Sequence, residues 1–387
     1  MKQITMLGAT GSIGQSTLDI VARHPGQYRL YALTANSNHQ KMVQLCRQFE
    51  PRFAVMSDPD SARLLGESIA DLATEILSGE DALAEVAAAD EVDVVVAAIV
   101  GAVGLMPTLS AVRAGKRVLL ANKEALVMAG GLFMDEVQRY GAELLPVDSE
   151  HNAIFQCLPP GSIGKGVAGE GVRKIILTGS GGPFRDIAVE RLEDVTPQQP
   201  CDHPNWDMGP KRSAESATMM NKGLELIEAC WMFAVDHSDV EILLHRQSIV
   251  HSMVAYSDGS VIAQMGNPDM RTPIANALAW PERIESGVEP LNLLQVSHLD
   301  FTQADEGRYP CLALAREAWQ QGGTSTTVLN AANEIAVEYF LNRQIKFTDI
   351  PRLITRVMEQ ATSAPANDLD AILEADSNAR ESARRLI

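Results

Sequence analysis

Two carboxylates lie two residues apart near the middle of the chain, where an apolar run ends. Asp148 and Glu150 follow the strand-like segment 143–147. In an extended segment the side chains at i and i+2 point the same way, so both carboxylates could bind one hard divalent cation. Alternatively, Asp148 or Ser149 caps a following helix, with Glu150 in its first turn. Taken alone, the pattern favours the helix cap.

A glycine-rich turn near the start of the chain predicts a nucleotide site. The sequence GATGSIG at 8–14 follows a short apolar strand at 3–7 and precedes a helix at 13–23. Glycines in this context let backbone N–H groups approach a pyrophosphate at the helix N-terminus. The spacing is GxxGxxG rather than GxGxxG, yet the strand and helix on either side favour nucleotide binding over a plain turn.

The next strand, 29–33, ends in a polar loop that bears on the choice of cofactor. Sites for NAD usually place an acidic residue here, to bind the ribose 2′-hydroxyl. The loop instead contains Asn36, Ser37 and Asn38, with His39 and Lys41 nearby. These side chains suit a 2′-phosphate and favour NADP, although a polar loop without any ligand has the same composition.

Two further strand ends carry candidate ligand-binding groups. The strand at 117–121 ends in Asn122, Lys123 and Glu124. A lysine there faces the crevice where open α/β sheets bind ligands, unless Asn122 is a helix cap beside a solvated Lys/Glu pair. The strand at 174–178 is followed by Gly-Ser-Gly-Gly-Pro, so Ser180 lies either in an anion-binding nest or in an ordinary turn.

Residues 201–210 form a loop by composition but contain large apolar side chains. Trp206 and Met208 lie between prolines and glycines in this segment. They indicate either a lid that packs over a ligand or a small satellite core under a loop.

A helix is predicted over 217–235. Thr218, Asn221, Lys222 and Glu225 fall on one face of it at 100° per residue. Taken alone, such a stripe of mixed charge is typical of a solvated helix face with an i,i+3 ion pair.

The order of elements predicts an α/β protein of several domains. Further strands are expected at 53–56, 92–98, 143–147, 240–245, 250–256 and 261–265, the last two joined by a hairpin at Ser257-Asp258-Gly259. Further helices are expected at 40–49, 61–65, 82–88, 311–321, 327–344, 350–362 and 369–387. We predict an N-terminal Rossmann-like NADP-binding domain (1–148), a central α+β catalytic domain (149–280), a connecting arm (281–310, with 268–280 leading into it) and a C-terminal helical domain (311–387).

Composition narrows the function. The 387 residues carry a net charge of −18, which argues against nucleic acid as a partner. The five cysteines are scattered and never form CxxC, as expected of reduced thiols in the cytoplasm. The chain enters a strand at once, which leaves no room for a signal peptide, and its longest apolar run is shorter than a membrane span.

Several of these segments together resemble one enzyme family. GATGSIG, ANKE, VDSEHNAIFQ, TGSGGPFR, HPNWDMG and SATMMNKGLE occur in the order and spacing of 1-deoxy-D-xylulose 5-phosphate reductoisomerases, and NPDMRTPI and LNAANE add to the match. The resemblance covers essentially the whole chain. VDSEHN together with MMNKGLE discriminates this family, whereas GATGSIG alone would not.

The resemblance implies a cytoplasmic, homodimeric enzyme of non-mevalonate isoprenoid biosynthesis that depends on NADPH and on Mg²⁺, Mn²⁺ or Co²⁺. It would rearrange the carbon skeleton of a small phosphorylated sugar by retro-aldol cleavage and aldol joining, and then reduce it by hydride transfer to 2-C-methyl-D-erythritol 4-phosphate. A bound metal would stabilise the developing charge, and a closed flap would exclude water.

The resemblance also assigns roles to residues. The metal ligands would be Asp148, Glu150 and Glu225. Substrate contacts would come from Lys123, Ser149, Glu150, His203 and Glu225, with the phosphate received by Ser180, Ser216, Asn221 and Lys222. The cofactor would be lined by Thr10, Gly11, Ser12, Ile13, Asn36, Ser37, Asn38, Asn122, Glu124 and Gly209. His203, Trp206 and Met208 would belong to the flap.

One departure and two rival functions remain. Many family members place a lysine where this chain has Ser37, which bears on how the 2′-phosphate is held. A different Rossmann dehydrogenase, of the homoserine or acylating semialdehyde type, is one rival; the acylating kind needs an activated cysteine, and none stands out. An NADPH-binding regulatory protein is the other, and it would have no use for three converging carboxylates.

Overall fold

The computed structural model describes residues 1–167, 170–199 and 209–387, which form two compact units. The first unit comprises Met1–Ala125, Asp135–Asn152 and Asp269–Glu289. The second comprises Leu126–Met134, Ala153–Pro268 and Pro290–Ile387. Each unit is therefore assembled from separate parts of the chain.

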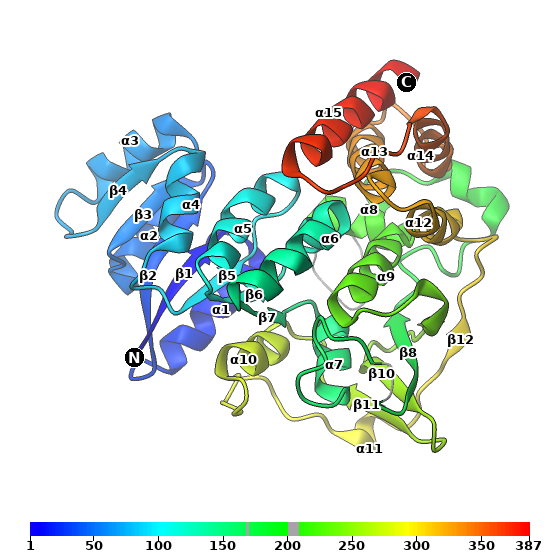
Figure 1. Ribbon diagram of the computed structural model, residues 1–387, viewed down its shortest axis with the longest axis horizontal. Helices are drawn as coiled ribbons and strands as arrows, with labels where there is room; N and C mark the ends of the chain where they lie inside the picture. The colour runs from blue at the N-terminus through cyan, green and yellow to red at the C-terminus, as the bar shows by residue number, and fades with distance from the viewer. Residues whose placement is uncertain (168–169, 200–208) are drawn as a thin grey trace. The chain divides into compact units, whose positions relative to one another are not determined.

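The first unit is built on a seven-stranded sheet whose pairings are all parallel (Figure 1). The strands are β1 (Lys2–Leu7), β2 (Tyr28–Ala35), β3 (Phe53–Met56), β4 (Glu75–Ser78), β5 (Val94–Ala97), β6 (Arg117–Leu120) and β7 (Glu143–Pro146). Their order is β4-β3-β2-β1-β5-β6-β7, so the direction of winding reverses between β1 and β5. This is the doubly wound arrangement that the alternating pattern predicted, and its switch point lies at the end of β1.

The helices of this unit alternate with the strands. They are α1 (Ser12–Arg23), α2 (His39–Phe49), α3 (Pro59–Ser68), α4 (Glu80–Ala88), the 3₁₀ turn η1 (Ala102–Gly104), α5 (Leu105–Arg113), the two ends of α6 (Lys123–Tyr140) and the start of α7 (Ser149–Cys157). The sequence predicted neither β4 nor α5 and α6. Helix α6 is hard to recognise because Ala129 leaves helical geometry and two glycines follow it.

A helix far along the chain, α10 (Arg271–Ala279), completes the first unit, where the sequence predicted a connecting arm. The Arg271 guanidinium pairs with Asp19 of α1 at 3.2 Å. The Asn152 amide donates to Asn276 Oδ1 at 3.1 Å. Most of the helix is buried, so it is part of the core and not a loose arm.

The second unit contains a five-stranded mixed sheet in the order β11-β10-β8-β9-β12. Its strands are β8 (Val172–Gly179), β9 (Val240–Leu244), β10 (Val250–Tyr256), β11 (Val261–Met265) and β12 (Thr302–Gln303). The predicted hairpin is confirmed, since β10 and β11 pair antiparallel and Asp258 Oδ1 accepts the Ser260 N–H at the turn. Strand β8 lies between β10 and β9, and it pairs antiparallel with β10 and parallel with β9.

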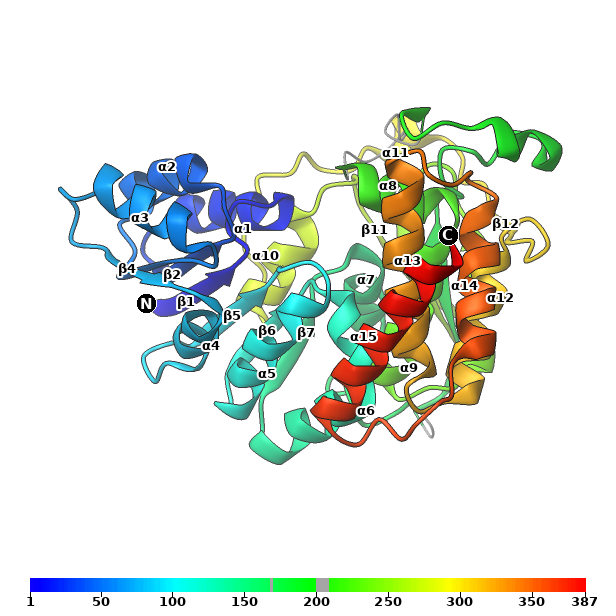
Figure 2. The same cartoon turned by 90° about the horizontal axis from the view of Figure 1, so that it is seen from above.

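Helices make up the rest of the second unit. They are η2 (Val189–Asp194), α8 (Gly209–Ala217), α9 (Met220–Phe233), η4 (His237–Asp239), α11 (Leu293–Val296), α12 (Pro310–Gln321), α13 (Ser325–Leu341), α14 (Asp349–Gln360) and α15 (Leu369–Leu386). Figure 2 shows α13, α14 and α15 side by side, and all three pairs are in contact. The four C-terminal helices lie close to their predicted positions because their apolar spacing is regular: α14 buries residues 350, 353, 354, 357 and 358.

Close packing around Trp231 fixes the kinked part of α6 within the second unit. A Cβ on Gly130 would lie 2.2 Å from the Trp231 ring, so only glycine leaves room for the indole there. Trp231 in turn packs edge-on against Trp319 of α12, with ring centroids 4.9 Å apart. Across the described residues, no helix combines the length and apolarity needed to cross a membrane.

Candidate active site

The glycine turn after β1 has the geometry of a nucleotide cradle. Gly8 has φ of +86° and donates its N–H to Thr34 Oγ1 at 3.0 Å. A Cβ on Gly8 would lie 2.8 Å from the Ala98 carbonyl oxygen, and one on Gly14 would lie 2.5 Å from that of Ala9. No side chain caps α1, whose first turn begins directly after Gly11. The turn can therefore offer backbone N–H groups to a pyrophosphate.

The cofactor residues predicted in the first unit all follow the carboxyl ends of parallel strands. Residues 10–13 follow β1, residues 36–38 follow β2, and Asn122 and Glu124 follow β6, so the sheet brings them to one edge. Asn36, Ser37 and Asn38 are exposed there. The Asn38 side chain caps α2 by accepting the Lys41 N–H at 3.1 Å. Gly209 begins α8 in the second unit.

Lys123 lies at the first turn of α6 and is not a solvated residue. Asn122 caps this helix by accepting the Glu124 N–H at 3.1 Å, as one of the two interpretations predicted. The other half of that interpretation, a solvated Lys/Glu pair, is wrong. Lys123 is buried and its Nζ lies 2.8 Å from Asp148 Oδ2.

Asp148 and Glu150 are positioned by the start of a helix. Strand β7 ends at Pro146 and α7 begins at Ser149, so Glu150 lies in the first helical turn and the expected extended i,i+2 geometry is wrong. The Ser149 hydroxyl donates to Glu150 Oε2 at 2.5 Å. The Asp148 carbonyl accepts the Asn152 N–H at 2.8 Å.

The Asp148 carboxylate is held in its charged form. Burial alone would raise the pKa of Asp148, but the charges of Lys123 and His151 and hydrogen bonds from neighbouring side chains outweigh it and lower the pKa well below 3.8. A carboxylate that stays ionised in a buried position is suited to a hard cation.

Helix α9 carries a buried polar cluster in the second unit. Asn221 Nδ2 and Lys222 Nζ both donate to the Glu225 carboxylate. The Lys222 and Glu225 side chains are only 4% and 1% exposed, so the solvated-face interpretation is wrong. The helix begins at Met220 and not at 217, and Thr218 precedes it and accepts the Met220 N–H.

The glycine loop after β8 packs directly on this cluster. A Cβ on Gly179 would lie 3.0 Å from Lys222 Cε, and one on Gly182 would lie 2.6 Å from the Ser216 carbonyl oxygen. The Gly182 N–H donates to Ser180 Oγ at 3.2 Å. The structure thus brings together the segments that contain Ser180, Ser216, Asn221 and Lys222, where a cationic lysine and hydroxyl groups could receive an anion.

His251 is a further candidate for the functional site, and nothing in the sequence gave a reason to select it. It lies in the apolar strand β10 and is 6% exposed. Burial lowers the pKa of His251 to about 4, and the nearby charge of Lys222 acts in the same direction. The imidazole is therefore neutral at physiological pH beside the cationic lysine. Its only sequence signal is a histidine within an apolar run.

Not every predicted site residue can be located. His203, Trp206 and Met208 lie outside the described residues, so the flap stays a prediction. Among the described cysteines, burial raises the pKa of Cys46 and Cys157 to about 11 and that of Cys311 to about 12. These thiols are poor nucleophiles at neutral pH, whereas an acylating dehydrogenase needs an activated cysteine.

Comparison with known proteins gives a consistent result. Three family models match: 1-deoxy-D-xylulose 5-phosphate reductoisomerase over residues 4–130, the C-terminal domain of 1-deoxy-D-xylulose 5-phosphate reductoisomerase over 144–233, and the DXP reductoisomerase C-terminal domain over 265–382. A Pseudomonas putida 1-deoxy-D-xylulose 5-phosphate reductoisomerase is 58% identical over 99% of this chain and 96% of its own length. The Stutzerimonas stutzeri enzyme of that name is 60% identical over 98% and 96%.

Solved structures are similar over the whole length. A DOX-P reductoisomerase in complex with NADPH, fosmidomycin and magnesium has a TM-score of 0.96 and 46% identity, covering 100% of this chain and 98% of its own. The Zymomonas mobilis 1-deoxy-D-xylulose 5-phosphate reductoisomerase in complex with NADPH has a TM-score of 0.93 with the same identity and coverage.

Proposed function

The chain belongs to the 1-deoxy-D-xylulose 5-phosphate reductoisomerase family, and on this premise we propose that it converts 1-deoxy-D-xylulose 5-phosphate into 2-C-methyl-D-erythritol 4-phosphate. The reaction is a skeletal rearrangement followed by reduction with NADPH, and it also requires a divalent metal. The relationship at 58% identity over 99% of the chain carries this proposal.

The residues present fit both required groups. At Gly8 and Gly14 a Cβ would collide with the carbonyl oxygens of Ala98 and Ala9, so glycine at these positions permits the tight turn after β1 that leads into the N-terminus of α1. Asp148, Glu150 and Glu225 provide carboxylate oxygens, the donors that Mg²⁺ and Mn²⁺ prefer. When bound, the dinucleotide supplies a hydride and the ion supplies a Lewis acid.

The chain's own side chains bind and orient the substrate. We assign the substrate phosphate to Ser180, Ser216, Asn221 and Lys222; contacts between the segments that contain them support this assignment. Lys123, at the start of α6, stabilises negative charge or transfers a proton during carbon–carbon cleavage. Ser149 and His203 contact the substrate, and the flap residues Trp206 and Met208 exclude water from the reacting fragments.

The organisation of the protein is part of the proposal. Residues 1–148 bind NADPH and contribute Lys123 and Asp148, 149–280 carry the other catalytic groups, 281–310 form an arm and 311–387 form a helical domain. The net charge of −18 argues against a nucleic-acid partner, and the scattered cysteines support a cytoplasmic location. A homodimer rests on the family alone.

The assay that tests this function follows NADPH absorbance. Purified chain should oxidise NADPH only when 1-deoxy-D-xylulose 5-phosphate and Mg²⁺ or Mn²⁺ are both present, and it should stop on addition of a chelator. Restoration by excess metal is the control for nonspecific inhibition. Full activity after exhaustive chelation would sink the metal assignment, and absence of turnover with either metal would sink the reaction.

A further inference from the structure

The glycine loop after β8 depends on contacts from other segments for its shape. Gly181 and Gly182 both have positive φ, of +82° and +73°. Glycine has more backbone freedom than any other residue, so two consecutive glycines need contacts that hold them in one conformation. Gly182 also packs closely on the residue before α9, because a Cβ there would lie 2.6 Å from the Ser216 carbonyl oxygen. The side chains that fix the peptides between Ser180 and Gly182 therefore bear on the phosphate site.

Tyr309 holds one of these peptides. Its hydroxyl donates to the Gly181 carbonyl oxygen at 3.1 Å, and Tyr309 is only 5% exposed. A planar trans peptide points its carbonyl and its N–H in opposite directions. The N–H of the same peptide, which is that of Gly182, donates to Ser180 Oγ at 3.2 Å. One peptide group therefore connects the Tyr309 hydroxyl to the Ser180 hydroxyl.

The peptide between Ser180 and Gly181 is also held through its carbonyl. Arg185 Nη1 donates to the Ser180 carbonyl oxygen at 2.8 Å, and the Arg185 side chain is 16% exposed. The stem of Arg185 also packs on the loop, because a Cβ on Gly181 would lie 3.3 Å from Arg185 Cβ. With both peptides held, the Ser180 hydroxyl is kept where it accepts the N–H of the second one.

Tyr309 belongs to a short segment that contacts this loop at three carbonyls. Besides the tyrosine hydroxyl, Arg308 Nη2 donates to the carbonyls of Phe184 and Ile187, both at 2.6 Å. The Arg308 guanidinium also lies 5.6 Å from the centroid of the Tyr309 ring. Pro310 follows and begins α12, which restricts the backbone of the tyrosine. The segment therefore presents the hydroxyl to the loop in a fixed position.

The hydrogen bond that Ser180 accepts affects what its hydroxyl can do. A hydroxyl group has one proton to donate and two lone pairs that accept. The Gly182 N–H uses one lone pair, so the proton of Ser180 can still be donated to a phosphate oxygen. Linked hydrogen bonds also polarise one another, which makes such a hydroxyl a stronger donor. If the Tyr309 hydroxyl were lost, the Gly181 carbonyl would lose the donor that holds its peptide in this orientation.

We propose that Tyr309 is a positioning residue of the phosphate site. It acts through the peptide between Gly181 and Gly182 on the Ser180 hydroxyl, to which the proposed function assigns the substrate phosphate. This inference rests on that function. Loss of the tyrosine hydroxyl therefore weakens binding of the phosphate group and hardly changes the steps that follow binding.

Tyr309→Phe tests the proposal, because it removes the hydroxyl and keeps the buried ring. We expect the KM for 1-deoxy-D-xylulose 5-phosphate to rise about fivefold, with kcat changed less than about twofold and NADPH affinity unchanged. The dissociation constant of inorganic phosphate should rise by the same factor, as measured by phosphorus NMR titration of the full chain saturated with NADPH. Normal KM and normal phosphate binding, or a fall in kcat at constant KM, would overturn the proposal.

A double-mutant cycle shows whether Tyr309 acts through Ser180. Ser180→Ala removes the hydroxyl that the peptide positions. Adding Tyr309→Phe to Ser180→Ala should then raise the KM by less than about twofold further, because the two changes interrupt the same connection. Fully additive effects of the two changes on KM would contradict this route and the positioning role with it.

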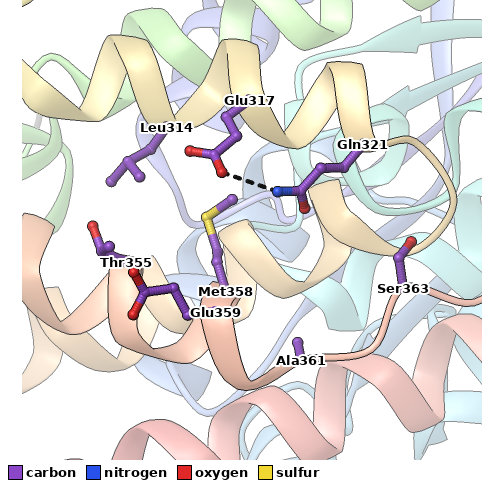
Figure 3. A pocket seen from close by; sticks show the side chains of 8 residues that line it. All are labelled: Leu314, Glu317, Gln321, Thr355, Met358, Glu359, Ala361 and Ser363. Atoms are coloured by element: carbon purple, nitrogen blue, oxygen red, sulfur yellow. Dashed lines mark hydrogen bonds between the residues drawn. The ribbon is translucent and has the colours of Figure 1, made fainter.

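Two controls separate positioning from a general loosening of the fold. Tyr256→Phe removes a hydroxyl that donates to the Cys157 carbonyl at 2.6 Å in the same unit. It should lower the melting temperature about as much as Tyr309→Phe does, with KM unchanged. Glu317→Gln alters α12 beside a hollow of about 480 Å³, where Glu317 accepts from Gln321 at 3.0 Å, and it should leave KM unchanged (Figure 3). An equal rise of KM in Tyr256→Phe would indicate loosening and overturn the proposal.

The outcomes also distinguish this inference from the proposed function. A wild-type chain that neither turns over the substrate nor binds inorganic phosphate would remove both. A wild-type chain that does either, with Tyr309→Phe behaving identically, would remove the positioning role alone.

Discussion

Lys123 Nζ lies 2.8 Å from Asp148 Oδ2, and the two side chains are only 10% and 17% exposed. The pair links the N-terminus of α6 to the turn before α7. Because burial alone would raise the pKa of Asp148, the lysine is one of the groups that keep this carboxylate ionised. A metal ligand and a cationic substrate contact are thus assigned to partners of one ion pair.

Replacement of this lysine tests the pair. Lys123→Met leaves a buried carboxylate without its cation, so we expect about 3 kcal/mol of destabilisation at neutral pH and a fall in turnover of about 100-fold or more. Wild-type Asp148, whose pKa is lowered, contributes stability above pH 3.8 and loses it as the pH falls below that value.

In the variant the pKa of Asp148 rises, because the neighbouring cation is gone. The destabilisation caused by Lys123→Met should therefore diminish as the pH falls toward 4. Melting temperatures of wild type, Lys123→Met and the charge-conserving Lys123→Arg between pH 8 and 5 measure this. A gap between wild type and Lys123→Met that stays constant with pH would contradict the explanation.

Glu225→Gln tests the polar cluster of α9. The change removes the carboxylate that accepts from Asn221 and Lys222, and it leaves the ammonium of Lys222 buried without that charge. We expect loss of turnover with NADPH binding intact, and about 3 kcal/mol of destabilisation. Fluorescence titration with NADPH and thermal melts measure the two effects. Glu241→Gln is the control. Glu241 forms a partly exposed ion pair with Lys174, so its substitution should hardly change the stability. Normal turnover in Glu225→Gln would remove this residue from the metal site.

His251 should make the stability of the protein depend on pH. The pKa of His251 is about 4 in the folded chain against 6.5 in the unfolded chain, so the unfolded state binds the proton more readily. Stability is then lost as the pH falls from 6.5 toward 4, by about 3 kcal/mol in total. His251→Gln should lose less stability over this range than the wild type does. Parallel pH dependence of the two melting temperatures would show that another group is responsible.

Gly14→Ala tests the nucleotide turn. Its Cβ would lie 2.5 Å from the Ala9 carbonyl oxygen, so the backbone of the turn has to move. We expect NADPH affinity to fall at least tenfold, by about 1.4 kcal/mol or more, as the N–H groups lose their alignment. Gly26→Ala is a matched control, because nothing lies within 4 Å of its Cβ and its φ is not positive. Equal NADPH affinity in both variants would argue against the cradle.

Local patterns were sufficient to predict much of the fold. The parallel strands other than β4 and the last four helices have apolar spacing that matches their burial, and the observed ends differ by a few residues at most. Helices α5 and α6 could not be recognised in this way. Helix α5 is short and has Pro107 in its first turn, and the interior of α6 contains the pair Gly130-Gly131, which disfavours helix. Gly130 is required only because Trp231, about 100 residues later, occupies the space beside it.

The site shows the same limit. Spacing on α9 correctly grouped Asn221, Lys222 and Glu225, but it could not show whether that face meets water, because burial depends on the packing of distant segments. The carboxylates at 148 and 150 were selected for a strand geometry that the structure does not have. Their residue types were informative although the geometric reason was wrong. His251 was missed because nothing local distinguishes a buried neutral histidine from any other residue of its strand.

The position of α10 also determines when the first unit can be completed during synthesis. All seven strands of its sheet have been synthesised by residue 146, yet the helix that contacts β6, β7 and α1 is encoded at 271–279. Until then the nascent sheet lacks that cover, and the acceptor of Arg117 Nη1, the Trp280 carbonyl, does not yet exist. More than 110 residues of the second unit are translated in between. The nucleotide-binding half is therefore begun first but cannot be finished first, and a fragment that ends near residue 152 would expose apolar surface to chaperones and proteases.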